Sequence, residues 1–149
     1  MAARSTYDSI IVGAGPAGAL LAYRLAAAGL AVLLLEKKQL PRCKTCGGGL
    51  TPRALKQLPF SVQPVIEDAT TTARLMVNGQ AVFNRTYPHP VVHMVMRERL
   101  DALLVQKAVE RGACLAQGTR FRAATGTPGN LTIETTDGTF QARCLVGAD

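Results

Sequence analysis

Three glycines and one acidic residue near the start of the chain have the types and the spacing that bind a dinucleotide. Residues 13–18 read Gly-Ala-Gly-Pro-Ala-Gly, and Glu36 follows 18 residues after Gly18. In this pattern Gly13 allows a tight turn, Gly15 lets the backbone approach a pyrophosphate, and Gly18 lets the next helix pack closely. The N–H groups at that helix N-terminus attract the phosphates. Glu36 can accept a hydrogen bond from a ribose hydroxyl, which favours NAD or FAD over NADP.

The segments around this motif make it more specific than the glycines alone. Residues 7–12 end in the apolar, β-branched run Ile-Ile-Val, residues 16–28 are apolar and rich in alanine, and residues 31–35 form a second apolar run. We therefore predict a βαβ unit, with Gly29 as the helix C-terminal cap. A signal peptide or a transmembrane helix would also be apolar here, but the internal glycines and Pro16 favour the βαβ unit.

The composition is that of an ordinary globular protein and excludes some classes of partner. Of the 149 residues 48% are hydrophobic and 18% are charged. The net charge of +7 comes from scattered basic residues, which predicts a basic surface that could attract an anionic membrane or an acidic redox partner. With 5% aromatic residues and no Trp there is little material for base stacking, so no nucleic acid is expected. Because no signal peptide is recognised, we expect a cytoplasmic protein whose four cysteines are thiols.

The rest of the chain predicts an antiparallel excursion, one more long helix and a β-meander. A short helix should begin after Thr51, which would be its N-cap, with Pro52 in its first position. The segment between Glu36 and Thr51 is polar and rich in glycine, which predicts a loop. The remaining expected elements are a hairpin of residues 73–77 and 81–87 with a type I′ turn at 78–79, a strand at 91–96, a helix at 99–111, a short strand at 114–115, and meander strands at 120–125, 131–136 and 140–146, the last returning to the main sheet.

This order of elements resembles the FAD-binding domains of the glutathione-reductase type. An NAD dehydrogenase would continue with βαβ units and would lack the long excursion. We therefore predict an α/β, Rossmann-like FAD-binding domain, with an antiparallel excursion at about residues 60–93 that belongs to a second, substrate-covering sheet. Because residues 144–149 read as a buried strand that runs into a turn, we expect residues 1–149 to be the N-terminal part of this domain, with its C-terminal remainder absent.

Further motifs resemble the geranylgeranyl reductase family of flavoproteins. Residues 34–37 read Leu-Leu-Glu-Lys, residues 44–50 read Lys-Thr-Cys-Gly-Gly-Gly-Leu, and residues 95–104 read Val-Met-Arg-Glu-Arg-Leu-Asp-Ala-Leu-Leu. Residues 147–149, Gly-Ala-Asp, match the start of the family's Gly-Ala-Asp-Gly turn. The resemblance extends over essentially the whole chain, but it covers the N-terminal portion of such an enzyme.

The resemblance implies an FAD site whose residues are spread along the chain. The glycine turn would hold the pyrophosphate, Glu36 the adenosine ribose, and the loop around Cys46 would lie near the flavin. Cys46 is also the candidate catalytic residue, and no metal is expected. The implied cofactor-binding residues are Gly13, Gly15, Ala17, Gly18, Glu36, Lys37, Cys46, Gly47, Gly49, Arg97, Phe121 and Asp149.

The resemblance also implies an activity. The protein would be an FAD-dependent oxidoreductase that reduces isolated C=C bonds of isoprenoid (geranylgeranyl) chains on a small molecule or lipid, with NADPH or reduced ferredoxin as electron donor. Two alternatives stay open, an aromatic hydroxylase-type FAD monooxygenase and a non-catalytic, truncated FAD-binding fragment. Cys43 and Cys46 form a C-x-x-C pair, which could be a regulatory disulfide; without a second such pair it is a poor zinc site.

Overall fold

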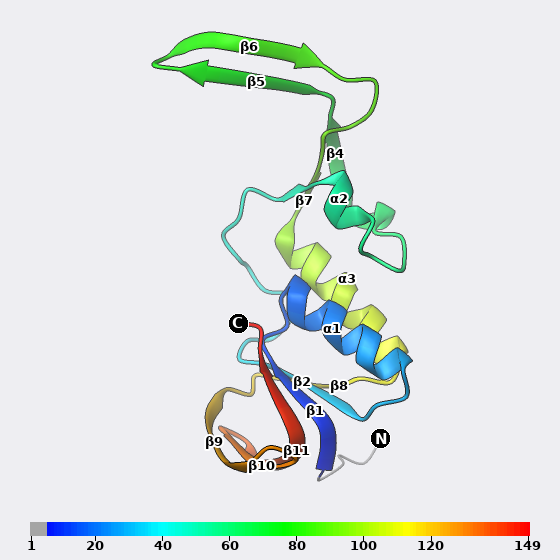
Figure 1. Ribbon diagram of the computed structural model, residues 1–149, viewed down its shortest axis with the longest axis vertical. Coiled ribbons are helices and arrows are strands. Elements are labelled where there is room, and N and C mark those ends of the chain that lie inside the picture. The colour runs from blue at the N-terminus through cyan, green and yellow to red at the C-terminus, as the bar shows by residue number, and fades with distance from the viewer. Residues whose placement is uncertain (1–5) are drawn as a thin grey trace. The chain divides into compact units, whose positions relative to one another are not determined.

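The computed structural model describes residues 6–149, which divide into two compact units. The larger unit comprises residues 6–42 and Asp101–Asp149, and the smaller unit comprises Cys43–Leu100. Figure 1 labels most of the elements, which are numbered in chain order. Because the smaller unit is one continuous insertion between two halves of the larger unit, the larger unit is completed by segments that are far apart in the sequence.

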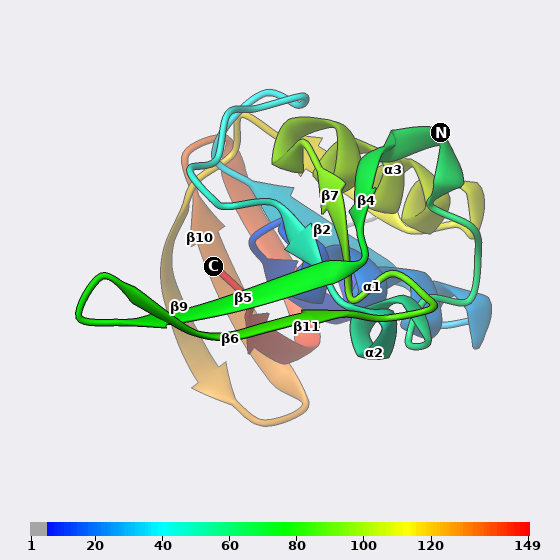
Figure 2. The same ribbon diagram turned by 90° about the horizontal axis from the view of Figure 1, so that it is seen from above.

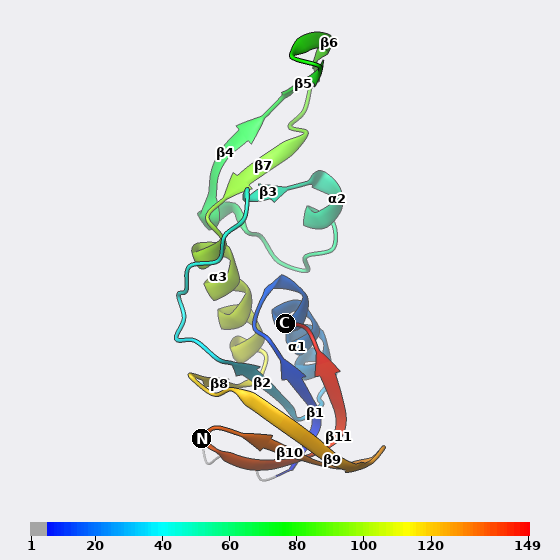
Figure 3. The same ribbon diagram turned by 90° about the vertical axis from the view of Figure 1, so that its left-hand side faces the viewer.

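Within its described residues, the larger unit is built on a six-stranded sheet in the order β8-β2-β1-β11-β10-β9. β1 pairs in parallel with both β2 and β11, and β2 pairs in parallel with β8 (Figure 3). β9, β10 and β11 form the predicted antiparallel meander, and β11 returns to the main sheet beside β1, as expected. The bounds are β1 Thr6–Val12, β2 Val32–Glu36, β8 Cys114–Gln117, β9 Phe121–Thr127, β10 Asn130–Thr135 and β11 Gly138–Gly147.

The helix α1, Pro16–Ala27, completes the predicted βαβ unit. Gly29, at φ +85°, adopts the left-handed conformation of a helix C-terminal cap. The helix α3, Arg97–Glu110, begins two residues earlier than expected, because the carbonyl of Met96 already accepts hydrogen bonds from the N–H groups of Arg99 and Leu100. In residues 6–149 no helix has both the length and the apolar character needed to cross a membrane.

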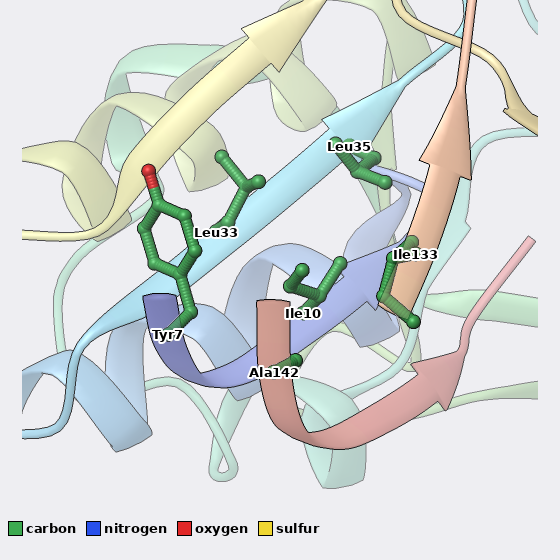
Figure 4. Packing of buried hydrophobic residues seen from close by; sticks show 6 residues of the cluster. All are labelled: Tyr7, Ile10, Leu33, Leu35, Ile133 and Ala142. Carbon is green, nitrogen blue, oxygen red and sulfur yellow. The ribbon is translucent and has the colours of Figure 1, made fainter. Parts of the chain in front are cut away.

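One hydrophobic cluster of the larger unit joins the parallel strands to the meander. Figure 4 shows side chains from β1, β2, β10 and β11 gathered in one cluster. Phe121 and Phe140 pack against it, and the ring of Phe140 meets that of Tyr7 edge-on at 6.3 Å. This packing ties the meander to the βαβ unit. The buried members of the cluster are Tyr7, Ile10, Leu33, Leu35, Ile133 and Ala142.

In residues 43–100 the smaller unit contains a three-stranded antiparallel sheet, β3-β7-β4, and the two-stranded hairpin β5–β6 (Figure 2). The turn of the hairpin has positive φ at both Asn78 and Gly79, which confirms the predicted type I′ turn. Thr51 Oγ1 accepts from the N–H of Ala54 at 3.3 Å, which confirms the predicted N-cap. The bounds are β3 Gly49–Leu50, α2 Pro52–Leu55, a 3-10 turn Gln63–Val65, β4 Ile66–Thr70, β5 Thr72–Val77, β6 Gln80–Thr86 and β7 Val92–Val95.

Two strands of the smaller unit were not expected from the sequence. β4 reads Ile-Glu-Asp-Ala-Thr and has no buried residue, so it lacks the apolar alternation that marks a half-buried strand. β3 has two residues and lies in the segment expected to be a loop; it exists because it pairs with β7. That the excursion at 60–93 covers a substrate stays a prediction.

Candidate dinucleotide site

The glycine turn lies at the carboxyl edge of the parallel strands of the larger unit. The N–H of Gly13 donates to the carbonyl of Leu35 at 2.8 Å, and the N–H of Ala148 donates to the carbonyl of Val12 at 2.8 Å. The ends of β1, β2 and β11 therefore meet around Gly13. In open α/β sheets this edge is where ligands bind.

The structure shows why Gly13 and Gly18 are glycines. Gly13 has φ +104°, and a Cβ atom there would lie 2.7 Å from the carbonyl oxygen of Ala148. A Cβ atom on Gly18 would overlap the carbonyl oxygen of Gly13 and would lie 3.3 Å from the Cβ of Ala148. Three backbone segments thus close the turn without room for side chains, which is the geometry that close packing of the helix on the strand requires.

The N-terminus of α1 is suited to an anion. Gly15 is its N-cap, and its φ of −76° is accessible to any residue, so its backbone conformation does not explain the glycine. Within the described chain no side chain caps this end, and the first turn contains no acid. Ala17 is exposed there. The uncapped N–H groups fit a pyrophosphate, which would accept hydrogen bonds from them.

Glu36 ends β2 and is held against the glycine turn. Glu36 is buried, with 4% of its surface exposed. Its Oε2 accepts from the N–H of Ala14 at 3.2 Å, and its Oε1 accepts from the N–H of Lys38 at 3.1 Å. The Nε of Arg42 lies 3.1 Å from Oε2. The acid that the sequence assigned to the ribose is therefore fixed in place by backbone donors and by one arginine.

Arg42 and Asp101 belong to this site although the sequence analysis did not find them. Nη1 of Arg42 lies 3.2 Å from Oδ2 of Asp101, an acid on α3 that is fully buried. Asp101 stands among Leu100, Leu104 and other buried residues of the helix. An acid on an apolar helix face was the signal that could have identified it, because a buried charge needs a partner.

The start of the meander lies next to Glu36. The N–H of Thr119 donates to the carbonyl of Glu36 at 3.0 Å, and Phe121 begins β9 two residues later. The Thr119 hydroxyl also donates to Asp137 at 2.5 Å, and this hydrogen bond lowers the pKa of the Asp137 carboxyl.

The larger unit contains eight of the residues assigned to the cofactor, namely Gly13, Gly15, Ala17, Gly18, Glu36, Lys37, Phe121 and Asp149.

The other assigned residues come together in the smaller unit. The N–H of Val95, at the end of β7, donates to the carbonyl of Gly48 at 2.9 Å, and Arg97 follows two residues later as the first residue of α3. The Sγ of Cys46 accepts from the N–H of Gly48 at 3.5 Å. The glycine-rich loop with Cys46, Gly47 and Gly49 is therefore pinned beside the start of α3, so Arg97 lies close to this loop in the fold.

The three consecutive glycines of this loop are not equivalent. Gly48 is buried with φ +71°, and a Cβ there would overlap the carbonyl oxygen of Val95. Gly49 would place a Cβ at 3.4 Å from Val92, an ordinary contact. No described atom beyond its chain neighbours lies within 4 Å of a Cβ built on Gly47. The fold therefore requires a glycine at 48 and not at 47.

Comparison with known proteins agrees with this geometry. The family described as FAD binding domain matches residues 6–149. The chain is 33% identical over 149 residues to an uncharacterized protein of Methanosarcina barkeri, covering 100% of this chain and 38% of that protein. It is 34% identical over 116 residues to the geranylgeranyl diphosphate reductase of Rhodobacter capsulatus, covering 78% of this chain and 29% of that protein. The chain therefore spans between 29% and 38% of the length of these two relatives.

A solved structure has the same fold. The geranylgeranyl bacteriochlorophyll reductase-like protein from Thermoplasma acidophilum superposes with a TM-score of 0.83 at 22% identity, over 97% of this chain and 39% of that one. The predicted fold class, an α/β FAD-binding domain of the glutathione-reductase type, is confirmed, and the chain belongs to the FAD binding domain family.

Proposed function

We propose that the protein containing this chain is an FAD-dependent oxidoreductase that reduces isolated C=C bonds of isoprenoid chains. The observation that carries the proposal is the closed glycine turn, with Gly13 and Gly18 packed against Ala148 beside the buried Glu36. The family match supports FAD as the cofactor of this turn. The substrate class is inferred from the name of the Rhodobacter capsulatus relative and from the Cys-Gly-Gly-Gly loop.

Different residues of the chain would bind different parts of the cofactor. The N–H groups that begin α1 would bind the pyrophosphate, and Glu36 would accept from the adenosine ribose. The loop from Cys46 to Gly49 and Arg97 would border the flavin, with Cys46 as the catalytic candidate. When bound and reduced, FAD would supply the hydride for one alkene carbon and an acid would supply the proton for the other, while the protein supplies binding, orientation and exclusion of water. We propose NADPH or reduced ferredoxin as the electron donor.

The full-length protein provides the test of this function. Heat release followed by mass spectrometry should identify FAD, and FMN or NAD alone would contradict the proposal. Under anaerobic conditions with a chemical reductant, geranylgeranyl diphosphate should gain two hydrogens for each bond reduced, whereas the protein stripped of its flavin should leave it unchanged. Oxygen-dependent hydroxylation of an aromatic compound would instead favour the monooxygenase alternative. Failure to reduce any isoprenoid, with FAD bound, would refute the assigned substrate class.

Alanine substitutions at two neighbouring glycines test the assignment of the loop. Gly48→Ala should lower the free energy of unfolding by about 1–3 kcal/mol, because both its positive φ and the carbonyl of Val95 oppose a side chain. Gly47→Ala should change it by less than about 0.5 kcal/mol, since the space around Gly47 is open. If the loop borders the flavin, Gly47→Ala should nevertheless reduce FAD retention.

Urea unfolding and the flavin content of the purified variants would provide these two measurements. A Gly47→Ala protein that is as unstable as Gly48→Ala would show that the loop geometry is wrong. A stable Gly47→Ala protein with full FAD content would remove Gly47 from the cofactor site.

A further inference from the structure

Three charged side chains from separate segments form a buried cluster at the carboxyl edge of the larger unit. Glu36 ends β2, Arg42 lies in the segment that follows, and Asp101 lies on α3, 59 residues further along the chain. The Arg42 guanidinium joins them, with Nε 3.1 Å from Glu36 and Nη1 3.2 Å from Asp101. The exposed fractions of the three side chains are 5%, 11% and 0%, respectively.

Arginine is suited to this arrangement of two carboxylates around one cation. Its planar guanidinium presents donors in a fixed fork, so it can hold two carboxylates at once in defined directions, whereas lysine offers a flexible point charge. Asp101 is completely buried and so is out of reach of any ligand in solution. Asp101 can therefore act on a ligand only through the residues that it contacts, and Arg42 is one of them.

Arg42 in turn sets the orientation of the Glu36 carboxylate. Within the described chain, Oε2 of Glu36 accepts a hydrogen bond from the N–H of Ala14 and lies 3.1 Å from the Nε of Arg42 in an ion pair, while Oε1 accepts from the N–H of Lys38. The ion pair with Arg42 holds the carboxylate at Oε2, and Oε1, with one described donor, can accept a second hydrogen bond. One oxygen is anchored, and the other is left to receive a hydroxyl.

We propose that Arg42, anchored by Asp101, is the positioning residue that makes Glu36 an acceptor for the adenosine ribose hydroxyl of the bound dinucleotide. This inference rests on the FAD site of the proposed function. Two carboxylates share one guanidinium, so the cluster has a net negative charge, which favours a hydroxyl donor over a 2′-phosphate. In this inference Arg42 affects cofactor specificity through the Glu36 carboxylate.

The test compares two ligands on the flavin-free, full-length protein. One is FAD and the other is an FAD analogue whose adenosine lacks the ribose 2′-hydroxyl, and flavin fluorescence reports the binding of each. The wild type should bind FAD about tenfold or more tightly than the analogue, as expected for a hydrogen bond to a charged group. This ratio of affinities should fall to about one in Glu36→Ala and close to one in Arg42→Met.

The control variants separate positioning from general damage. Arg143→Met removes an arginine of the same unit whose pairing with Asp8 is on the surface, and it should keep the wild-type ratio. Asp101→Asn preserves the side-chain shape and should lower the ratio by about threefold. If Arg42→Met does not fold, Asp101→Asn is the variant that tests the positioning role. Arg42→Lys should restore part of the ratio of affinities that Arg42→Met loses, because lysine keeps the positive charge but not the forked donor geometry of the guanidinium.

The outcomes distinguish this inference from the function on which it rests. An unchanged ratio in Arg42→Met, or in Asp101→Asn where Arg42→Met does not fold, overturns the positioning role, even if both ligands bind more weakly. A wild type that binds FAD but does not discriminate between the ligands also overturns it, while leaving the FAD site intact. A wild type that binds no FAD refutes the proposed site and the inference together.

Discussion

Replacing Gly18 with alanine should abolish FAD binding by the full-length protein and lower its free energy of unfolding by about 1–3 kcal/mol. The new Cβ would overlap the carbonyl oxygen of Gly13, and the Cβ of Ala148 would lie 3.3 Å away. Neither neighbour is the flexible end of a long side chain, so the strain must be relieved by a backbone shift, at a cost typical of overpacking. A shift of α1 away from the turn would move the N–H groups that the pyrophosphate requires.

Flavin content after purification and urea unfolding would measure the two effects of Gly18→Ala. Gly147→Ala is the matched control for stability, because Gly147 lies at the same edge of the sheet and no described atom beyond its neighbours is within 4 Å of the place where its Cβ would lie. Its free energy of unfolding should stay within about 0.5 kcal/mol of the wild type. A Gly18→Ala protein with wild-type stability and a full complement of FAD would contradict the closed turn.

The parts of the fold that the sequence predicts well are those with a local signal. β1 and β2 lie in the parallel part of the sheet; β2 is buried throughout and β1 is buried at Ser9–Ile11, so each contains a short apolar run. The turn at Asn78-Gly79 requires two residues with positive φ, which these residue types adopt readily. The meander is marked by its own turn residues between alternating segments. In each case the chemistry that fixes the element is contained in a few neighbouring residues.

The parts that the sequence did not predict depend on partners far along the chain. β3 and β4 become strands because β7 lies between them, and neither has a distinctive pattern of its own. Gly48 and Gly47 look alike in the sequence, yet only the contact of Gly48 with Val95 makes a glycine necessary. Such constraints appear only when the tertiary pairing is known.

The candidate site also has one part that the sequence predicts and one part that it does not. The glycine motif and Glu36 are recognisable because their spacing reflects one βαβ unit. Arg42 and Asp101 could not be paired from the sequence, since 59 residues separate them and Arg42 alone resembles an ordinary surface charge. The support for Glu36 is therefore tertiary, although Glu36 itself is identified by a local motif.

Substituting Arg42 with methionine should lower the free energy of unfolding of the full-length protein by about 3–5 kcal/mol. Methionine fills similar space but leaves Glu36 and Asp101 buried without their shared counter-charge, and breaking a buried ion pair from one side has a cost of this size. Arg143→Met breaks a surface ion pair with Asp8, in which the Arg143 side chain is 72% exposed. It should lower the free energy of unfolding by no more than about 1 kcal/mol.

Adding Asp101→Leu to Arg42→Met should recover part of the stability that Arg42→Met loses. The double variant removes one of the two carboxylates that Arg42 pairs with, while Glu36 keeps its hydrogen bonds from Ala14 and Lys38. Urea unfolding of the wild type, both single variants and the double variant forms a double-mutant cycle, and the coupling between residues in contact should be about 0.5–3 kcal/mol. Additive effects, or an Arg42→Met protein no less stable than Arg143→Met, would show that Arg42 and Asp101 do not form a buried ion pair. Coupling in the expected range would show that Asp101 ties α3 to Arg42, which pairs with the proposed ribose acceptor Glu36.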